Sequence, residues 1–301
     1  MSDLVLVTGA GGAHGGTGAH LVRGLLAHDI PVRVLVRRET ATSTSLAAAG
    51  ADVVIGDLHD RRTLTPALEG VTQAYFTYPI AEGVLAAAAN WSEAIRTTSR
   101  PIRTVVMSMA PAHPDHPSPR GRDQWLAEQV MRWAGLDVLV LRVMALFHEN
   151  LEILHATTIT TEGVIRNAFG PGQVPWISGA DAAEIALAAF LRPHTFTGDT
   201  ARISGTESAS HTEIATMTEN LLGRPIHFTP VDAQTWKDEL HNADPTKIPR
   251  EMATHIPAVA EAVAKAGPML PADSTQFTHL TGKPPRTLAN YLAATAPHFT
   301  A

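Results

Sequence analysis

Six glycines gather near the start of the chain, at positions 9, 11, 12, 15, 16 and 18. Glycine lacks a Cβ atom, so it adopts positive φ angles and lets the backbone approach a phosphate group closely. Gly9, Gly12, Gly15 and Gly18 lie three residues apart, which gives two overlapping G-x-x-G-x-x-G registers in a loop one turn longer than usual. We predict that this loop binds the pyrophosphate of a dinucleotide. A flexible surface linker is the alternative.

The segments on either side of the loop favour the dinucleotide hypothesis. Residues 4–7 form a short apolar run, which is typical of a buried parallel strand. Leu21, Val22, Leu25 and Leu26 recur at helical spacing, so a helix should follow the loop. The start of that helix offers free N–H groups and the positive end of its dipole to phosphates. The residues expected to contact the cofactor here are Gly9, Gly12, Ala13, His14, Gly15 and Gly18, with His14 touching phosphate rather than performing chemistry.

Strands and helices alternate along the first half of the chain. The expected strands are residues 32–36, 53–55, 74–76, 104–107 and 138–141, separated by helices at 46–49, 64–68, 81–96 and 123–133. This alternation predicts an α/β fold with a Rossmann-type, doubly wound parallel sheet. Ligands of such sheets bind beyond the carboxyl ends of the strands. The loops that start at Gly9, Arg37, Asp57, Thr77 and Ser108 should therefore line one crevice.

The end of the second predicted strand indicates which dinucleotide is bound. An acidic residue at this place binds the ribose hydroxyls of NAD, but here the strand ends in Arg37 and Arg38. A guanidinium pairs bidentately with a 2′-phosphate and stacks on adenine. NADP(H) is therefore expected in preference to NAD(H), although two adjacent arginines can also be solvated surface. Thr77, Tyr78 and Pro79 would pass under the nicotinamide ribose.

The second half of the chain has a weaker pattern. Residues 110–120 are rich in proline and histidine, which predicts a non-helical segment that is either a lid or a simple excursion. Beyond Asn150 we expect a helix at 181–191, strands at 201–203 and 226–228, a helix at 212–222 that ends at Gly223, and a mostly helical tail from Pro249. We divide the chain into an NAD(P)-binding domain at 1–150 and a smaller α/β, substrate-side portion at 151–301. This portion is not expected to be an independent or freely tethered domain, and it could interleave with the first.

Composition narrows the class of protein. The chain has 301 residues, of which 45% are hydrophobic and 17% charged, so it should bury a sizeable core. A net charge of −6 argues against a nucleic-acid-binding surface. The absence of cysteine excludes disulfides and thiolate chemistry. The first strand starts too early for a signal peptide, and no apolar run is long enough to span a membrane, so a cytoplasmic protein is expected.

Five motifs, taken in order, resemble the NmrA-like branch of the atypical short-chain dehydrogenase/reductases over nearly the whole chain. They are VTGAGGAHGGTG; VRVLVR followed by GDL at 56–58; LDVLVLRVMALFHENL at 136–151; VPWISGADAAEIA from Val174; and LTGKPPRTLANYL near the C-terminus. The resemblance implies a Rossmann fold, an NAD(P) site, and either a reductase of quinone-like substrates or a cofactor-sensing regulator. It also implies an adenine-side contact at Asp57, with Leu58 beside it; a turn at the strand end is the alternative role of Asp57.

The chain departs from the wider superfamily in its catalytic residues. Ordinary members use a Tyr-x-x-x-Lys pair, but none of Tyr75, Tyr78 and Tyr291 has a lysine four residues further on. The four lysines all lie in the second half, and Gln124 stands near the usual place of the lysine. The standard mechanism is therefore excluded. A quinone or another conjugated acceptor remains suitable, because it takes hydride with less help from an acid.

Four side chains are candidate proton donors. Ser108 ends a strand and could meet a developing oxyanion, or it could simply cap a loop. Tyr78 could act as an acid or pack against the cofactor. His113 and His148 have a suitable side chain for proton transfer near neutral pH, but for each of them a solvated loop residue is the favoured interpretation. No metal-binding spacing of histidines and no G-x-S-x-G elbow is present, so neither a metal nor a hydrolase is proposed.

Two functions follow from these patterns. The first is an NADPH-dependent oxidoreductase that transfers hydride to a small conjugated carbonyl or quinone-like substrate. The second is a non-catalytic, NADP(H)-binding regulator of the NmrA type that senses redox state. The expected partner of the enzyme is a small-molecule substrate, without nucleic acid or membrane, and a homodimer is left open.

Overall fold

The computed structural model of the protein describes residues 3–11, 15–98 and 100–300. The chain forms two compact units. The first unit combines Met1–His116, Arg120–Val143 and Ala182–Arg202. The second unit combines Pro117–Pro119, Met144–Asp181 and Ile203–Ala301.

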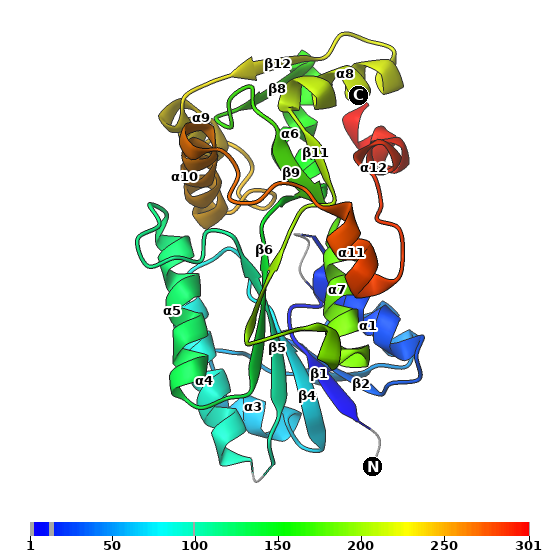
Figure 1. Ribbon diagram of the computed structural model, residues 1–301, viewed down its shortest axis with the longest axis vertical. Coiled ribbons are helices and arrows are strands. Elements are labelled where there is room, and N and C mark those ends of the chain that lie inside the picture. The colour runs from blue at the N-terminus through cyan, green and yellow to red at the C-terminus, as the bar shows by residue number, and fades with distance from the viewer. Residues whose placement is uncertain (1–2, 12–14, 99, 301) are drawn as a thin grey trace. The chain divides into compact units, whose positions relative to one another are not determined.

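A seven-stranded sheet in the order β10-β6-β5-β4-β1-β2-β3 is the framework of the first unit (Figure 1). Its strands are β1 (Leu4–Val7), β2 (Val32–Val36), β3 (Asp52–Ile55), β4 (Val71–Phe76), β5 (Arg103–Met109), β6 (Val138–Val143) and β10 (Thr200–Ile203). Strands β1 to β6 pair in parallel with their neighbours. The predicted doubly wound α/β fold is confirmed.

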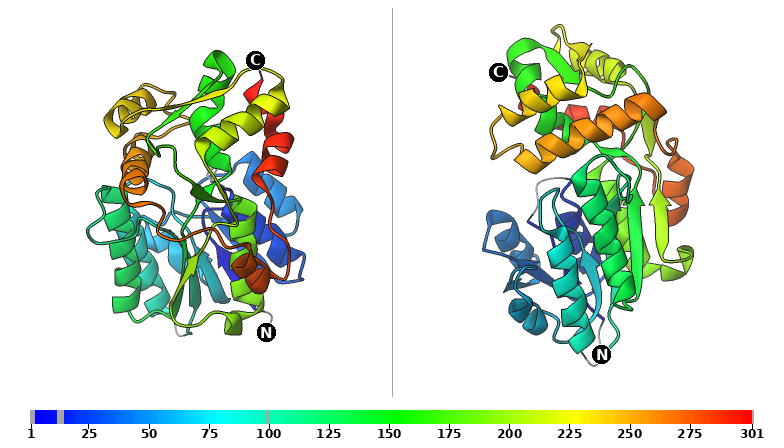
Figure 2. Two further views of the ribbon diagram at one scale, coloured as in Figure 1. Left: turned by 45° about the horizontal axis from the view of Figure 1, so that its top comes forward. Right: turned by 90° about the vertical axis from the view of Figure 1, so that its left-hand side faces the viewer.

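Helices cover both faces of this sheet. They are α1 (Thr17–Leu26), α2 (Ala41–Ala48), α3 (Arg61–Ala67), α4 (Val84–Thr97), α5 (Pro119–Trp133) and α7 (Gly179–Leu191). Helices α3, α4 and α5 lie on one face, and α1 and α7 lie on the other (Figure 1). In the right-hand view of Figure 2, α4 and α5 run side by side in front of the strands.

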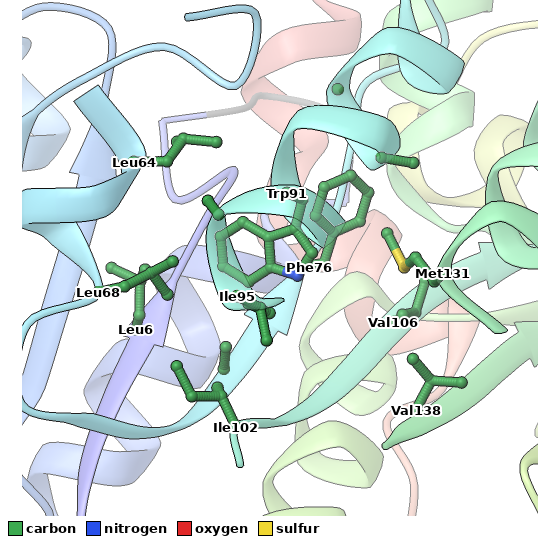
Figure 3. Close-up of a cluster of buried hydrophobic side chains, with 14 of the residues drawn as sticks. Leu6, Leu64, Leu68, Phe76, Trp91, Ile95, Ile102, Val106, Met131 and Val138 are labelled. Carbon is green, nitrogen blue, oxygen red and sulfur yellow. The ribbon is translucent and has the colours of Figure 1, made fainter. Parts of the chain in front are cut away.

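The core under α3, α4 and α5 forms because alternate residues of each strand point to that face. Leu6 from β1, Phe76 from β4 and Trp91 from α4 belong to one cluster of side chains there, and all three are fully buried (Figure 3). The rings of Phe76 and Trp91 are 5.6 Å apart. On the opposite face, Gly24 lets α1 approach α7, because a Cβ at this position would lie 2.9 Å from the Leu187 side chain.

The second unit is built from two small sheets and several helices. Strands β11 (Glu207–Ala209), β9 (Val174–Ile177) and β7 (Leu146–Phe147) form one sheet, and β12 (His227–Pro230) pairs in parallel with β8 (Val164–Asn167). The helices are α6 (Glu149–Glu162), α8 (His211–Leu222), α9 (Ala233–His241), α10 (Arg250–Ala266), α11 (Ser274–Thr281) and α12 (Leu288–Thr295). Short 3₁₀ turns occur at Pro193–Thr195 in the first unit and Ala296–Phe299 in the second. None of the helices in the described part of the chain is long and apolar enough to cross a membrane.

Two parts of the secondary structure differ from the prediction. The segment 110–120 was expected to exclude helix up to its end, but α5 already begins at Pro119. Proline suits the first turn of a helix, where its missing N–H would have no partner. Helices α6 and α9 and strands β7, β8, β9 and β11 were not predicted from the local pattern, whereas the predicted C-cap of α8 at Gly223 is confirmed by its φ of +66°.

Candidate cofactor site

The turn after β1 is tied to the end of β4. The Thr77 N–H donates to Thr8 Oγ1 at 3.0 Å, and that hydroxyl donates to the Thr77 carbonyl at 3.2 Å. Gly9 follows with a φ of +70°, and a Cβ there would lie 2.3 Å from Thr77 Cγ2. Only glycine therefore fits this turn, where the chain leaves the sheet.

The first turn of α1 rests directly on the same backbone. A Cβ at Gly18 would lie 2.8 Å from the N and Cα atoms of Ala10. The helix begins after Gly16, which has a φ of +56° and gives no side-chain cap to the helix. The uncapped first amides of a helix are a suitable binding surface for phosphate. Gly15, with a φ of +66°, completes the described part of the loop, and the predicted contacts Gly12, Ala13 and His14 lie outside the described residues.

Two charged side chains follow the ends of β2 and β3: the cation Arg37 and the carboxylate Asp57. Arg37 is exposed and makes no hydrogen bond or ion pair with the described residues. Asp57 is half-buried; its Oδ1 accepts the His59 N–H at 2.9 Å, and its own N–H donates to Thr63 Oγ1 at 2.9 Å. Leu58 is held through its carbonyl, which accepts a hydrogen bond from Asn90 at 3.0 Å. Arg37 is thus available to an anionic ligand, while the Asp57 loop is fixed.

Tyr78 lies in the loop after β4, between Thr77 and Pro79, and is hydrogen-bonded twice. Its hydroxyl donates to the Glu82 carbonyl at 2.8 Å and lies 2.7 Å from His59 Nε2. Burial raises the pKa of the Tyr78 phenol, and the nearby charges of Arg37 and Asp57 act on it in opposite directions. His59 was not predicted as a site residue; its place two residues after Asp57 is the signal that the sequence offers for it.

Ser108, at the end of β5, belongs to a buried ionic network. Its hydroxyl donates to Glu128 Oε1 at 2.5 Å, and the Glu128 side chain on α5 is 0% exposed. Arg142 on β6 binds both carboxylate oxygens, and Arg132 lies 3.5 Å from Oε2. In this arrangement Ser108 has committed its proton to Glu128, so it offers only lone pairs to a ligand.

The two candidate histidines have different surroundings. His113 is exposed, and its Nδ1 accepts the Asp115 N–H at 3.1 Å within a turn. His148 lies in the second unit and is 0% exposed, with its ring 5.6 Å from that of Tyr291 and its Nε2 3.4 Å from Glu207. His113 is therefore a solvated loop residue, as one of its two interpretations predicted. The same interpretation is wrong for His148, which is buried.

A shallow depression of about 430 Å³ lies at the opposite, amino edge of the sheet. It is lined by residues from the ends of α3 and α4 and the start of β4, namely Thr65, Pro66, Leu68, Glu69, Val71, Thr97, Thr98 and Arg100. We assign it no role, because ligands of parallel sheets bind at the carboxyl edge. Within the described residues no group of three acidic or histidine side chains is arranged to hold a metal.

The sheet, the glycine turn and the uncapped helix start together define the class of dinucleotide-binding Rossmann proteins. The model of the NmrA-like family matches residues 1–292, and the chain belongs to this family. It is 28% identical over 300 residues to an NAD(P)H azoreductase from Xenophilus azovorans. This alignment covers 98% of this chain and 99% of the azoreductase.

Solved structures share the fold over almost the full length of the chain. An NADPH-dependent quinone oxidoreductase from Escherichia coli, in complex with NADPH, has a TM-score of 0.79 and 20% identity, covering 97% of this chain and 99% of that one. NmrA, a negative transcriptional regulator in complex with NADP, has a TM-score of 0.76 and 16% identity, covering 98% and 96%.

Proposed function

We propose that the protein is an NADPH-dependent oxidoreductase that transfers hydride to a small conjugated acceptor, a quinone-like or conjugated carbonyl compound. The observation that carries this proposal is the close contact between Gly18 and Ala10. This contact holds the uncapped start of α1 directly beside the turn at Gly9, in the geometry that Rossmann proteins use for a pyrophosphate. The similarity to an NAD(P)H azoreductase supports the reaction class.

Arg37 is proposed to select NADPH over NADH. It directly follows β2, at the strand end where the ribose 2′-position of the adenosine half is bound in Rossmann proteins. It has no partner among the described residues, so its fork of N–H donors can pair with a 2′-phosphate without breaking another bond. Both solved structures named above contain the phosphorylated cofactor.

The residues of the chain act in this proposal by binding and orientation. Bound NADPH supplies a hydride, which together with one proton reduces a quinone or an enone. Ser108 and Tyr78 both have their hydroxyl protons committed to neighbours, to Glu128 and to the Glu82 carbonyl. Neither is placed as a dedicated acid, so we propose that water supplies the proton. Conjugated acceptors suit such a site because they delocalise the charge that develops, and holding the reactants face to face lowers the barrier.

Steady-state NADPH oxidation tests this function. The purified protein should oxidise NADPH in the presence of quinones, enones or azo dyes, and should use NADH less well. If NADPH binds but no acceptor is reduced, the enzyme proposal is contradicted and the NADP(H)-sensing regulator is favoured. A protein that binds no dinucleotide in a direct titration would contradict both.

A further inference from the structure

The loops after β3 and β4 hold a pair of side chains that no motif marks, His59 and Tyr78. His59 Nε2 lies 2.7 Å from the Tyr78 hydroxyl, and the two rings meet edge to face with centroids 5.8 Å apart. We propose that His59 is a positioning residue that locks the Tyr78 ring as one wall of the adenosine subsite. This inference rests on the proposed function, because it assigns a role within the same cofactor site.

The hydrogen bonds of Tyr78 show why its ring, and not its hydroxyl, meets the ligand. The hydroxyl donates its proton to the Glu82 carbonyl at 2.8 Å and must therefore accept from His59 Nε2. Both bonds fix the far end of the ring and therefore its χ1 torsion, while the edge-to-face contact with His59 restricts rotation of the ring about χ2. The half-buried ring is consequently held in one orientation, with part of it open to a ligand.

The backbone that begins α4 is shaped around this pair. Gly83 has a φ of +98°, which disfavours every residue with a Cβ. A Cβ there would lie 2.4 Å from His59 Cε1 and 3.0 Å from the Tyr78 hydroxyl oxygen. The missing side chain at Gly83 thus leaves the space in which the two rings meet.

The neighbours of Tyr78 put its ring on the adenosine side of the site, and not under the nicotinamide ribose as expected from the sequence. Its hydroxyl bonds to His59, which follows β3, and β3 pairs with β2. Arg37 and Asp57, at the ends of β2 and β3, both act electrostatically on the Tyr78 hydroxyl. The end of β2 is where Rossmann proteins hold the adenosine ribose. A fixed aromatic ring there offers a flat face to a purine, and such stacking does not depend on the 2′-phosphate. The ring should therefore serve NADPH and NADH equally, unlike Arg37.

Binding titrations with NADPH, NADH and ADP test the assignment. Tyr78→Phe and His59→Ala each remove the hydrogen bond between the pair, and each should weaken all three ligands by about three- to tenfold. The double variant should lose no more than Tyr78→Phe alone, because that variant already removes both hydrogen bonds of the hydroxyl, including the one to His59. His59→Gln keeps an N–H donor and should recover most of the affinity. Arg37→Ala is the matched comparison, because it should weaken NADPH far more than NADH or ADP.

Three results would overturn the inference while the wild-type protein binds NADPH. A loss confined to NADPH would show that the pair reads the phosphate. Weaker binding of both NADPH and NADH with unchanged ADP affinity would place Tyr78 at the nicotinamide end. Unchanged affinity for NADPH, NADH and ADP would show that the pair has no role in cofactor binding. A wild-type protein that does not bind NADPH would contradict the proposed function itself. Tyr78→Phe removes only an oxygen and His59 is exposed, so circular dichroism should confirm that both variants fold.

Discussion

Replacing Glu128 by glutamine is the most direct test of the buried network beside Ser108. Glutamine keeps the shape of the side chain and removes its negative charge. Arg142 and Arg132 then face a neutral amide, and Ser108 loses its charged acceptor. The Glu128 side chain is 0% exposed, and those of the two arginines are only 18% and 19% exposed, so water can replace little of the lost interaction.

The expected cost follows from this burial. Removing one partner of a buried ion pair costs about 3–5 kcal/mol of unfolding free energy. The partial exposure of the arginines favours the lower end, so we expect Glu128→Gln to cost about 3 kcal/mol. Glu162 offers a matched control, because it also pairs bidentately with an arginine, Arg166, but is 47% exposed. Glu162→Gln should cost about 0.5 kcal/mol or less.

Urea denaturation of the three proteins measures these values directly. A Glu128→Met/Arg142→Met double variant adds a second check, because apolar replacement of a whole buried pair is often close to neutral. It should recover most of the stability that Glu128→Gln loses. Equal, small losses for Glu128→Gln and Glu162→Gln would refute the reasoning, and so would a double variant less stable than Glu128→Gln.

Three further predictions concern the cofactor and the second unit. Gly15→Val should abolish NADPH binding in a titration while circular dichroism shows a folded protein, because φ is +66° there; unchanged affinity would remove the loop from the site. Arg37→Ala should weaken NADPH about tenfold or more and NADH little, and equal losses would count against phosphate recognition. Burial lowers the pKa values of His155 and His211 from 6.5 to about 3. As the pH falls below 6.5, these two side chains become protonated in the unfolded chain but stay neutral in the folded protein, which destabilises the folded state. Urea denaturation should show a loss of about 2 kcal/mol per histidine between pH 7 and pH 5. A His155→Phe/His211→Phe variant should lose this pH dependence, whereas exposed His279→Gln should keep it; an unchanged dependence in the double variant would be the contrary result.

The first half of the fold could be predicted from the sequence because its signals are local. Buried parallel strands are continuous apolar runs, as at residues 4–7 and 32–36, and each is followed by a segment of helical spacing. The family resemblance rested on motifs at the strand ends, and the family match over residues 1–292 confirms it. The roles of the individual cofactor residues stay predictions.

The second half was less predictable because its elements are short or run against local preference. Strand β7 has two residues and β11 has three, too few to show a period of two. Helix α6 contains four threonines, at 157, 158, 160 and 161, whose branched side chains lower helix propensity. Its helical state depends on tertiary packing through Leu151, Leu154 and Ile159.

The side-chain pairs of the site could not be predicted for another reason. Ser108 and Glu128 are 20 residues apart in the chain, and His59 and Tyr78 are 19 apart. Each pair joins different elements, so neither leaves a spacing that a single sequence reveals. The donor role considered for Ser108 and Tyr78 depended on a free hydroxyl proton, which only the geometry of these pairs could test.

Strand β10 lies at the edge of the sheet beside β6, although it is made much later in the chain, and this affects how the sheet forms during synthesis. Strand β6 can pair with its outer neighbour, β10, only after Asp199 has been synthesised, since the Val140 N–H donates to the Asp199 carbonyl. About 60 residues separate the two, which corresponds to roughly 3–12 s of translation. Throughout this interval β6 is an open sheet edge, able to pair with another nascent chain. We expect chaperone dependence to be greatest in this interval. Pulse proteolysis of ribosome-bound chains would show it as a cleavage-sensitive stage that ends once β10 has emerged.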